Sequence, residues 1–153
     1  MGKFEGPVLI GAGEGGSVNV LGAAATYKAT HAQTAGQYSL FEQDIPVGYG
    51  APMHRHDTED EAFYVLEGEI VLESETGTWR AGRGSFAYFP RGSLHGFRNE
   101  SGLPARALVI CTPGAKLERC FKAFEAAGRR GDLVPAALGV IAASHGVEIV
   151  PPA

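Results

Sequence analysis

Turn signals recur at short, even intervals between Gln37 and Cys111, and they limit this stretch to short secondary-structure elements. Each signal contains glycine or proline, the residues that interrupt regular structure most strongly. The runs between them are rich in β-branched and aromatic residues, which favour strands. We therefore predict strands over residues 38–43, 53–56, 62–67, 69–73, 78–79, 85–89, 95–98 and 106–111.

The predicted strands follow one another with no helical pattern between them. Such spacing is typical of an antiparallel sandwich or barrel, so we expect an all-β fold. Glycine accounts for 22 of the 153 residues, about twice its average usage, which suits a fold with many turns. The net charge of −4 provides no basic field, so we expect neither nucleic acid nor a membrane surface as a partner.

We expect a single domain over residues 1–153, made of three parts. Residues 1–36 are rich in small residues and predict an N-terminal β arm, with short strands at 8–10 and 17–21, that lies over the barrel or over a second subunit. Residues 37–112 form the predicted barrel. Residues 113–153 predict a helix with an apolar stripe that ends at Gly128, a second helix over 135–145 and an extended tail.

The sequence shows no targeting or membrane-spanning segment. Its first residues are charged early, and the longest uncharged stretch near the C-terminus, residues 133–147, is interrupted by proline and glycine. Cys111 and Cys120 are nine residues apart and form no CxxC pair, so we expect two reduced, buried thiols. These features favour a cytoplasmic protein.

Three of the five histidines lie in two turn-flanked strand segments. His54 and His56 are one residue apart, so on a strand both imidazoles point to the same face. Glu61 begins the next predicted strand, and His95 follows a tight Pro-Arg-Gly turn. Three imidazoles and one carboxylate are a plausible ligand set for a first-row transition metal, although an HxH pair alone is more often structural.

Several other features of the sequence receive structural interpretations. We expect Glu59 and Asp60 to belong to a solvated turn and His31 to lie on the surface. The GxGxxG pattern at residues 11–16 follows an apolar run but opens no helix, so we expect a flexible turn and not a nucleotide site. Arg91 and Arg98 flank the histidines; we expect them to face solvent, with the steering of an anionic substrate as the alternative.

Residues 48–68 read GYGAPMHRHDTEDEAFYVLEG and residues 84–99 read GSFAYFPRGSLHGFRN. They resemble the two cupin motifs, G(X)5HXH(X)3–4E(X)6G and G(X)5PXG(X)2H(X)3N, at every defined position. The resemblance implies a jelly-roll barrel, a double-stranded β-helix, with one divalent transition metal (Ni, Co, Mn, Fe, Cu or Zn) bound by His54, His56, Glu61 and His95. The wider sequence is similar to single-domain bacterial cupins related to quercetin 2,3-dioxygenase, which also carry a helical C-terminal segment.

That resemblance implies a dioxygenase that cleaves a flavonol-like or enolic aromatic substrate with O2. Glu61 would accept the substrate's hydroxyl proton, helped by a pKa that burial raises toward neutrality. The alternatives are a metal-dependent isomerase or decarboxylase acting on a small acid or sugar, and a non-catalytic cupin that binds a small ligand. We expect a homodimer, because cupins commonly dimerise and because an unpaired strand at the barrel edge is more stable when another segment covers it. The candidate substrate-pocket residues, each equally well explained as barrel core, are Phe41, Met53, Phe63 and Phe97.

Overall fold

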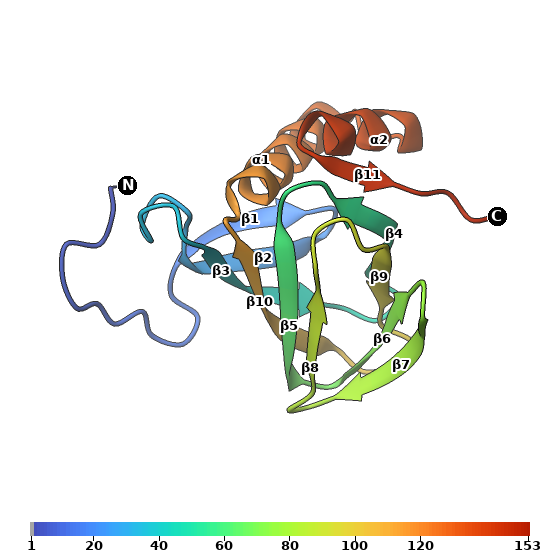
Figure 1. The fold of residues 1–153 in the computed structure, drawn as a ribbon, viewed down its shortest axis with the longest axis horizontal. Coiled ribbons are helices and arrows are strands. Elements are labelled where there is room, and N and C mark those ends of the chain that lie inside the picture. Colours follow the sequence, from blue (N-terminus) through green and yellow to red (C-terminus); the bar gives the residue numbers. More distant parts are fainter. Residues whose placement is uncertain (1) are drawn as a thin grey trace.

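The computed structural model describes residues 2–153 (Figure 1). All the strands predicted between residues 38 and 111 are present, with bounds that differ by a few residues. The elements are, in chain order, β1 (Gly16–Val20), β2 (Ala23–Ala29), β3 (Ser39–Ile45), β4 (Gly50–His56), β5 (Asp60–Glu67), β6 (Glu69–Ser74), β7 (Gly77–Gly82), β8 (Phe86–Phe89), β9 (His95–Arg98), β10 (Ala105–Thr112), α1 (Ala115–Arg130), α2 (Pro135–Ser144) and β11 (Val147–Ile149).

The strands form two antiparallel sheets that enclose the core of an all-β barrel. The first sheet has the order β1-β2-β3-β10-β5-β8 and the second the order β11-β4-β9-β6-β7. Buried residues alternate with more exposed ones along β2, β3 and β10, as expected for strands with one face toward the core. Gly68, with φ 73°, makes the tight turn between β5 and β6, where a Cβ atom would lie 2.7 Å from the Pro104 carbonyl oxygen.

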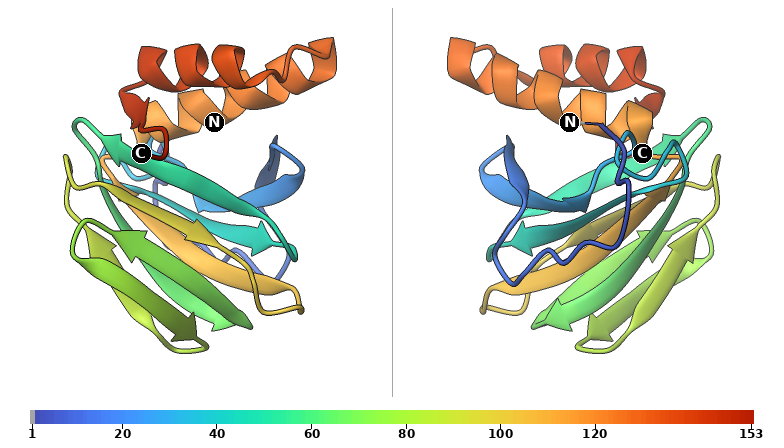
Figure 2. Two further views of the ribbon diagram at one scale, coloured as in Figure 1. Left: turned by 90° about the vertical axis from the view of Figure 1, so that its right-hand side faces the viewer. Right: turned by 90° about the vertical axis from the view of Figure 1, so that its left-hand side faces the viewer.

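The two C-terminal helices lie across one end of the barrel (Figure 2). Helix α1 buries one stripe of residues, Leu117, Cys120, Phe124 and Ala127. It does not end at Gly128 as predicted but continues to Arg130 and ends at Gly131, whose left-handed conformation suits a helix C-terminus. No helix within residues 2–153 is long and apolar enough to cross a membrane.

The extended tail after α2 joins the second sheet, which the sequence analysis did not predict. β11 pairs with β4, and its residues Val147 and Ile149 stand opposite His56 and His54. Only three residues of β11 are in the strand, too few for an alternating pattern to be visible in the sequence. The C-terminal segment therefore forms the edge of the sheet that carries both histidines of the HxH pair.

The N-terminal region differs from the prediction in two ways. Residues 8–10 form no strand: no neighbouring strand pairs with them, and Leu9 is 90% exposed. Residues 23–29, in contrast, form β2, an alanine-rich strand with weak intrinsic preference that is stabilised by pairing with β1 and β3. The β arm expected in this region is thus a hairpin built into the first sheet.

His31 is not a surface residue as expected but connects the N-terminal region to the base of α1. Its ring is partly buried, and Nδ1 lies 2.7 Å from the carbonyl oxygen of Pro113. Its backbone N–H donates to the carboxylate of Glu118 at 2.5 Å. Its polar neighbours in the sequence gave no sign of these two contacts, because both partners are more than 80 residues away.

Glu59 was expected in a solvated turn, and this prediction is wrong. Its side chain is buried, and its carboxylate accepts hydrogen bonds from the backbone N–H groups of Lys116 at 2.7 Å and Leu117 at 3.2 Å. These are free donors of the first turn of α1, and the negative charge also suits the positive end of the helix dipole. Glu59 therefore caps α1 from a distant loop, a role that local sequence does not reveal.

Substituting Glu59 by alanine should destabilise the protein more than a substitution in a loop usually does. Two buried N–H groups would lose a charged acceptor, at a cost of about 2–3 kcal/mol in the free energy of unfolding measured in urea. The matched control is Asp60→Ala, because Asp60 pairs with the exposed Arg91 and should lose less. Equal losses in the two variants would contradict the capping role of Glu59.

Candidate metal centre

Both histidines of the HxH pair point into the barrel from β4. His54 and His56 are buried, while Arg55 between them is more exposed. Their ring centroids lie 5.1 Å apart. The period of two along a strand thus places both imidazoles on the inner face, as the sequence predicted.

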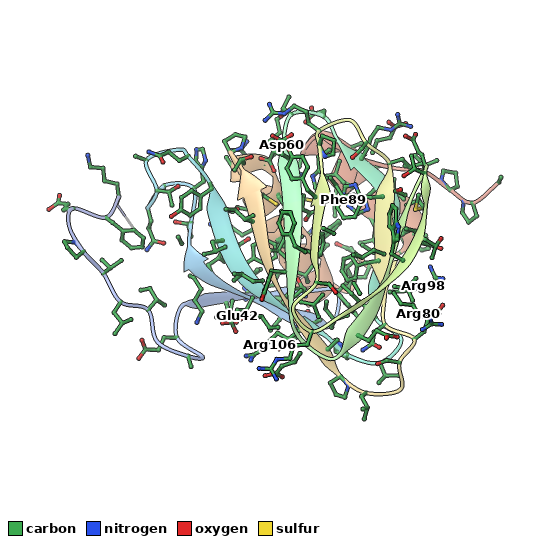
Figure 3. The ribbon with its side chains drawn as sticks, turned by 60° about the horizontal axis from the view of Figure 1, so that its bottom comes forward. Glu42, Asp60, Arg80, Phe89, Arg98 and Arg106 are labelled. Atoms are coloured by element: carbon green, nitrogen blue, oxygen red, sulfur yellow. The ribbon has the colours of Figure 1, made fainter. Side chains whose placement is uncertain are left out.

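The other two candidate ligands approach from different strands. His95 on β9 stands directly opposite His54 in the sheet register, with ring centroids 4.5 Å apart. Glu61 comes from β5 of the other sheet, so the site bridges the two sheets. Phe89 on β8 stacks on His95, with centroids 4.3 Å apart and an interplanar angle of 5°, and holds that ring in place (Figure 3 labels Phe89).

The four side chains meet at one point inside the barrel. One ligand atom from each of His54, His56, Glu61 and His95 can be chosen so that all lie within 4.8 Å of one another, and all four residues are buried. Glu61 Oε2 lies 2.8 Å from His95 Nε2 and 3.4 Å from His56 Nε2. The structure therefore brings together the full set of ligands that the sequence predicted.

The outer nitrogens of two of the rings are fixed by the backbone. His54 Nδ1 lies 2.7 Å from the carbonyl oxygen of Pro52, and His95 Nδ1 lies 3.1 Å from that of Ser93. A carbonyl oxygen can only accept, so each Nδ1 donates to the backbone and each Nε2 is directed at the centre, where His95 Nε2 lies within hydrogen-bond distance of Glu61. Such hydrogen bonds from backbone groups are typical of histidines that bind metals.

A metal ion would satisfy polar atoms that the residues of this site leave without partners. His56 Nε2 is buried and makes no hydrogen bond within the described chain. Burial, followed by repulsion from His95, lowers the pKa of His54 to about 4, so this ring is neutral and ready to bind at neutral pH. Three imidazoles and an ionised carboxylate suit a divalent first-row metal, so the residues fit the ion that the sequence implied.

The pKa of Glu61 moves in the opposite direction to the prediction. Burial by itself raises the pKa of this carboxyl group, as expected. His56 and His95 outweigh burial, however, and hold the pKa of Glu61 well below its ordinary value. Glu61 is therefore a permanently ionised group near neutral pH, which suits a metal ligand and makes it a weaker base than the sequence analysis assumed.

A cavity of about 110 Å³ is lined by three of the four ligands, His54, His56 and Glu61, and extends to the helical segment. Of the predicted pocket residues, Phe41, Phe63 and Phe97 line it, but Met53 does not. Met53 is odd-numbered on a strand whose even-numbered residues face inward, so it points to the opposite side. The same alternation that placed His54 and His56 together was sufficient to exclude it.

Several lining residues were not anticipated from the sequence. They come from the end of β1 and the turn after it, from the β3–β4 region, from β10 and from the C-terminal segment. These residues are Val20, Leu21, Gln43, Tyr49, Gly50, Ala51, Pro52, Val109, Leu117, Cys120, Phe121, Phe124, Ala142, Val147 and Ile149. The apolar stripe of α1 was the one available signal, because a buried helical face must cover something.

Both cysteines are free and buried, as predicted. Cys111 Sγ lies 3.7 Å from Glu61 Oε1, so its thiol faces the oxygen directed away from His95. Burial raises the pKa of the Cys111 thiol well above its ordinary value and that of Cys120 to about 12. Both groups are therefore neutral thiols and not nucleophilic thiolates.

The arginines near the motifs face outward, as expected. Arg91 binds the carboxylate of Asp60 through Nε and Nη2 at 3.0 Å each. Arg98 pairs with Glu73 and Glu100 on the outer surface, and neither arginine lines the cavity. Figure 3 shows Arg80, Arg98 and Arg106 at the periphery of the barrel.

The match to a known family covers the strands that build this site. Residues 41–111 match the family described as Cupin_2, cupin domain, and this range includes all four candidate ligands. The fold is a cupin barrel.

Solved and curated proteins resemble this protein over part of its length. Uncharacterized protein MJ1618 of Methanocaldococcus jannaschii is 29% identical over 75 residues, which cover 49% of this chain and 60% of that protein. A structure described as a sugar phosphate isomerase from a cupin superfamily, from Silicibacter pomeroyi, has a TM-score of 0.54 and 29% identity, covering 60% of this chain and 59% of that one. The polyketide cyclase RemF from Streptomyces resistomycificus has a TM-score of 0.53 and 28% identity, covering 65% and 68%.

The alignment with MJ1618 and with the isomerase spans about three fifths of each of those proteins. The similarity therefore covers only part of each of those proteins.

The protein should bind one divalent metal ion through the four converging side chains. His54→Ala or His95→Ala removes an imidazole and should reduce the bound metal, measured by mass spectrometry after dialysis, to a small fraction of that in the unaltered protein. His145→Ala is the control, because His145 Nδ1 contacts the Ile141 carbonyl within the C-terminal segment. Full metal content in the His54 variant would contradict the assignment.

Metal uptake should weaken steadily as the pH falls. Burial lowers the pKa of His56, but the attraction of Glu61 outweighs it and raises the pKa above the usual value. His56 therefore takes up a proton at a higher pH than an ordinary histidine and must lose it to bind metal. Affinity should fall by about tenfold per pH unit below that pKa, measured by competition with a chelator. An affinity independent of pH between 5 and 8 would contradict this.

Proposed function

We propose that this protein is a metal-dependent dioxygenase of the cupin type. Its substrate is a small enolic or aromatic compound whose hydroxyl and carbonyl oxygens can both bind the metal. The observation that supports the proposal is the apolar cavity lined at one end by three of the four ligands, His54, His56 and Glu61. A site with four protein ligands leaves one or two coordination positions for a substrate. The cavity then selects what occupies them.

The character of the lining favours an uncharged, largely apolar substrate. Aromatic and aliphatic side chains make up most of the wall, and Gln43 and Tyr49 are its polar members outside the ligand set. Among the described residues, none that lines this cavity is lysine or arginine. A phosphate group would therefore find no cation to bind it, which weighs against a sugar phosphate as the substrate.

The size of the cavity favours a small ligand within the predicted class. Pockets for drug-sized ligands usually enclose about 300–1,000 Å³. The cavity of about 110 Å³ suits a compact enol or a single ring better than a three-ring flavonol. The proposal therefore keeps the enolic substrate and favours smaller members of that class.

The residues of the site have three tasks in this reaction. Phe63 and Phe97 exclude water and provide flat surfaces against which a planar substrate can lie. His54 and His95, oriented by backbone carbonyls, keep their Nε2 atoms directed at the centre. The ionised carboxylate of Glu61 lines the cavity and accepts the proton of the substrate hydroxyl.

A bound divalent metal would hold two oxygens of the substrate and lower the pKa of its hydroxyl group. That chemistry suits the low pKa of Glu61, because a weak base suffices for an acidified hydroxyl group.

Two other functions remain as alternatives. The similarity to a protein described as a sugar phosphate isomerase favours an oxygen-independent isomerase or decarboxylase built on the same ligands. A non-catalytic cupin that binds a small ligand would use the same cavity without turnover. Oxygen consumption separates the first proposal from both alternatives.

Oxygen uptake with a small panel of compounds tests the proposal. The metal-free protein is reconstituted separately with Mn, Fe, Co and Ni and mixed with acetylacetone, a compact enol, or with quercetin, a three-ring flavonol. We expect metal-dependent uptake that is faster with the compact enol. Glu61→Gln should lower turnover by about 10²-fold or more, because the proton acceptor is lost.

His145→Ala serves as the control and should retain full activity. Bound metal is measured in each sample, so that lost chemistry is distinguished from lost metal. Absence of uptake with metal demonstrably bound would refute the dioxygenase and leave the isomerase and the ligand-binding protein as the alternatives.

A further inference from the structure

The cavity opens to solvent at a small set of residues, which we call the mouth. A residue of the mouth must both line the cavity and be exposed, and Leu21, Gly50 and Pro52 meet both conditions. Leu21 lies in the turn between β1 and β2, and the other two lie at the start of β4. Leu21 is 38% exposed and has the largest flexible side chain of the three.

The backbone of Leu21 adopts a conformation that leucine rarely takes. Val20 and Ala23 are paired in the hairpin, so Leu21 and Gly22 form its two-residue turn, with φ 54° and 100°. Two positive φ angles define the turn type that strongly prefers Asn-Gly. This conformation is unfavourable for leucine because its Cβ is crowded. The strain therefore indicates that the leucine side chain has a functional role at this position.

Three hydrogen bonds hold the hairpin turn in its place beside the mouth. Tyr49 Oη donates to the carbonyl oxygen of Val20 at 2.6 Å, which ties the hairpin to the loop before β4. Gly22 N–H donates to Asn19 Oδ1 at 3.0 Å, and Asn19 N–H donates to Glu125 of α1 at 3.0 Å. The turn is thus fixed from the barrel side and from the helix side.

We propose that Leu21 controls access to the cavity and limits the size of the ligand that reaches the metal centre. The same cavity is lined by Leu21 at its outer end and by His54, His56 and Glu61 at its inner end, so a ligand entering by the mouth passes Leu21. The chemistry of that ligand rests on the proposed function. The position of the entrance does not.

The other two residues of the mouth are poor candidates for this control. A Cβ at Gly50 would lie 2.1 Å from the carbonyl oxygen of Phe97, so the backbone there is packed without room for a side chain. Pro52 is rigid, and its carbonyl group orients His54. Leu21 alone of the three carries rotatable side-chain bonds next to solvent.

The test uses the full chain loaded with zinc and three variants. Leu21→Asn shortens the side chain and suits a positive φ, whereas Leu21→Phe enlarges it. Ala35→Asn is the matched control, because Ala35 has the same φ of 54°, is exposed and lies outside the cavity lining. Any effect of relieving backbone strain should appear in both asparagine variants, whereas an effect on the mouth should appear in Leu21→Asn alone.

The measurement is the rate at which the coloured chelator 4-(2-pyridylazo)resorcinol extracts the zinc, followed at several chelator concentrations. Leu21→Asn should raise the rate by about three- to tenfold. This is the factor expected when the entering molecule no longer has to push a side chain out of its preferred rotamer. Leu21→Phe should lower the rate, and Ala35→Asn should match the unaltered protein. Equal rates in all four proteins, or equal acceleration in both asparagine variants, would overturn the proposal.

Binding of acetylacetone to the cobalt-loaded protein, followed by absorbance, is measured in parallel. Faster association in Leu21→Asn would extend the control of access to a substrate-like ligand. Failure of the unaltered protein to bind acetylacetone would count against the proposed substrate class alone, because zinc extraction still decides the role of Leu21.

Discussion

The ionised carboxylate of Glu61, buried among three imidazoles, is the constraint on which this structure depends. A charged group inside a barrel is costly unless opposite charge or a metal compensates it. Here the compensation comes from β4 and β9 of one sheet, while Glu61 belongs to β5 of the other. The site therefore joins the two sheets, and the close approach of their inner faces is as much a requirement of the charge as of the apolar core.

The helical segment is tied to this centre through the residues next to the ligands. Glu59, between His56 and Glu61 in sequence, caps α1, and β11 after α2 pairs with the strand that carries His54 and His56. Asp57 adds an ion pair with Lys116 at 2.8 Å. The loop that supplies the ligands thus also supplies the anchor of the helices, so the cover of the cavity and the geometry of the centre are set by the same few residues.

The sequence was sufficient for the strands, the ligand set and the helical stripe, because each depends on a local period or a short spacing. It was not sufficient where a partner lies far away in the chain. Glu59 looks like a surface acid until the N–H groups of Lys116 and Leu117 are placed beside it, and β11 is a strand only because β4 is available. The predicted rise in the pKa of Glu61 was wrong because burial is readable from its neighbours in sequence, whereas the close approach of His56 and His95 from the opposite sheet is not. Met53 is a different case, since the alternation of β4 already excluded it.

The walls of the cavity differ in how firmly they are held, and this difference bears on substrate choice. The inner wall belongs to strands whose backbones are paired on both sides, such as β4 between β11 and β9 and β5 between β10 and β8. The outer wall consists of side chains of α1 and α2, with Phe121 and Phe124 the bulkiest of them, and α2 buries only Ala142. A change in the inner wall disturbs the ligands, because the same strands hold them. A change in the outer wall alters the cavity volume while leaving the ligand-bearing strands intact, so the two helices are where a barrel of this design can acquire a new substrate with least effect on the metal centre.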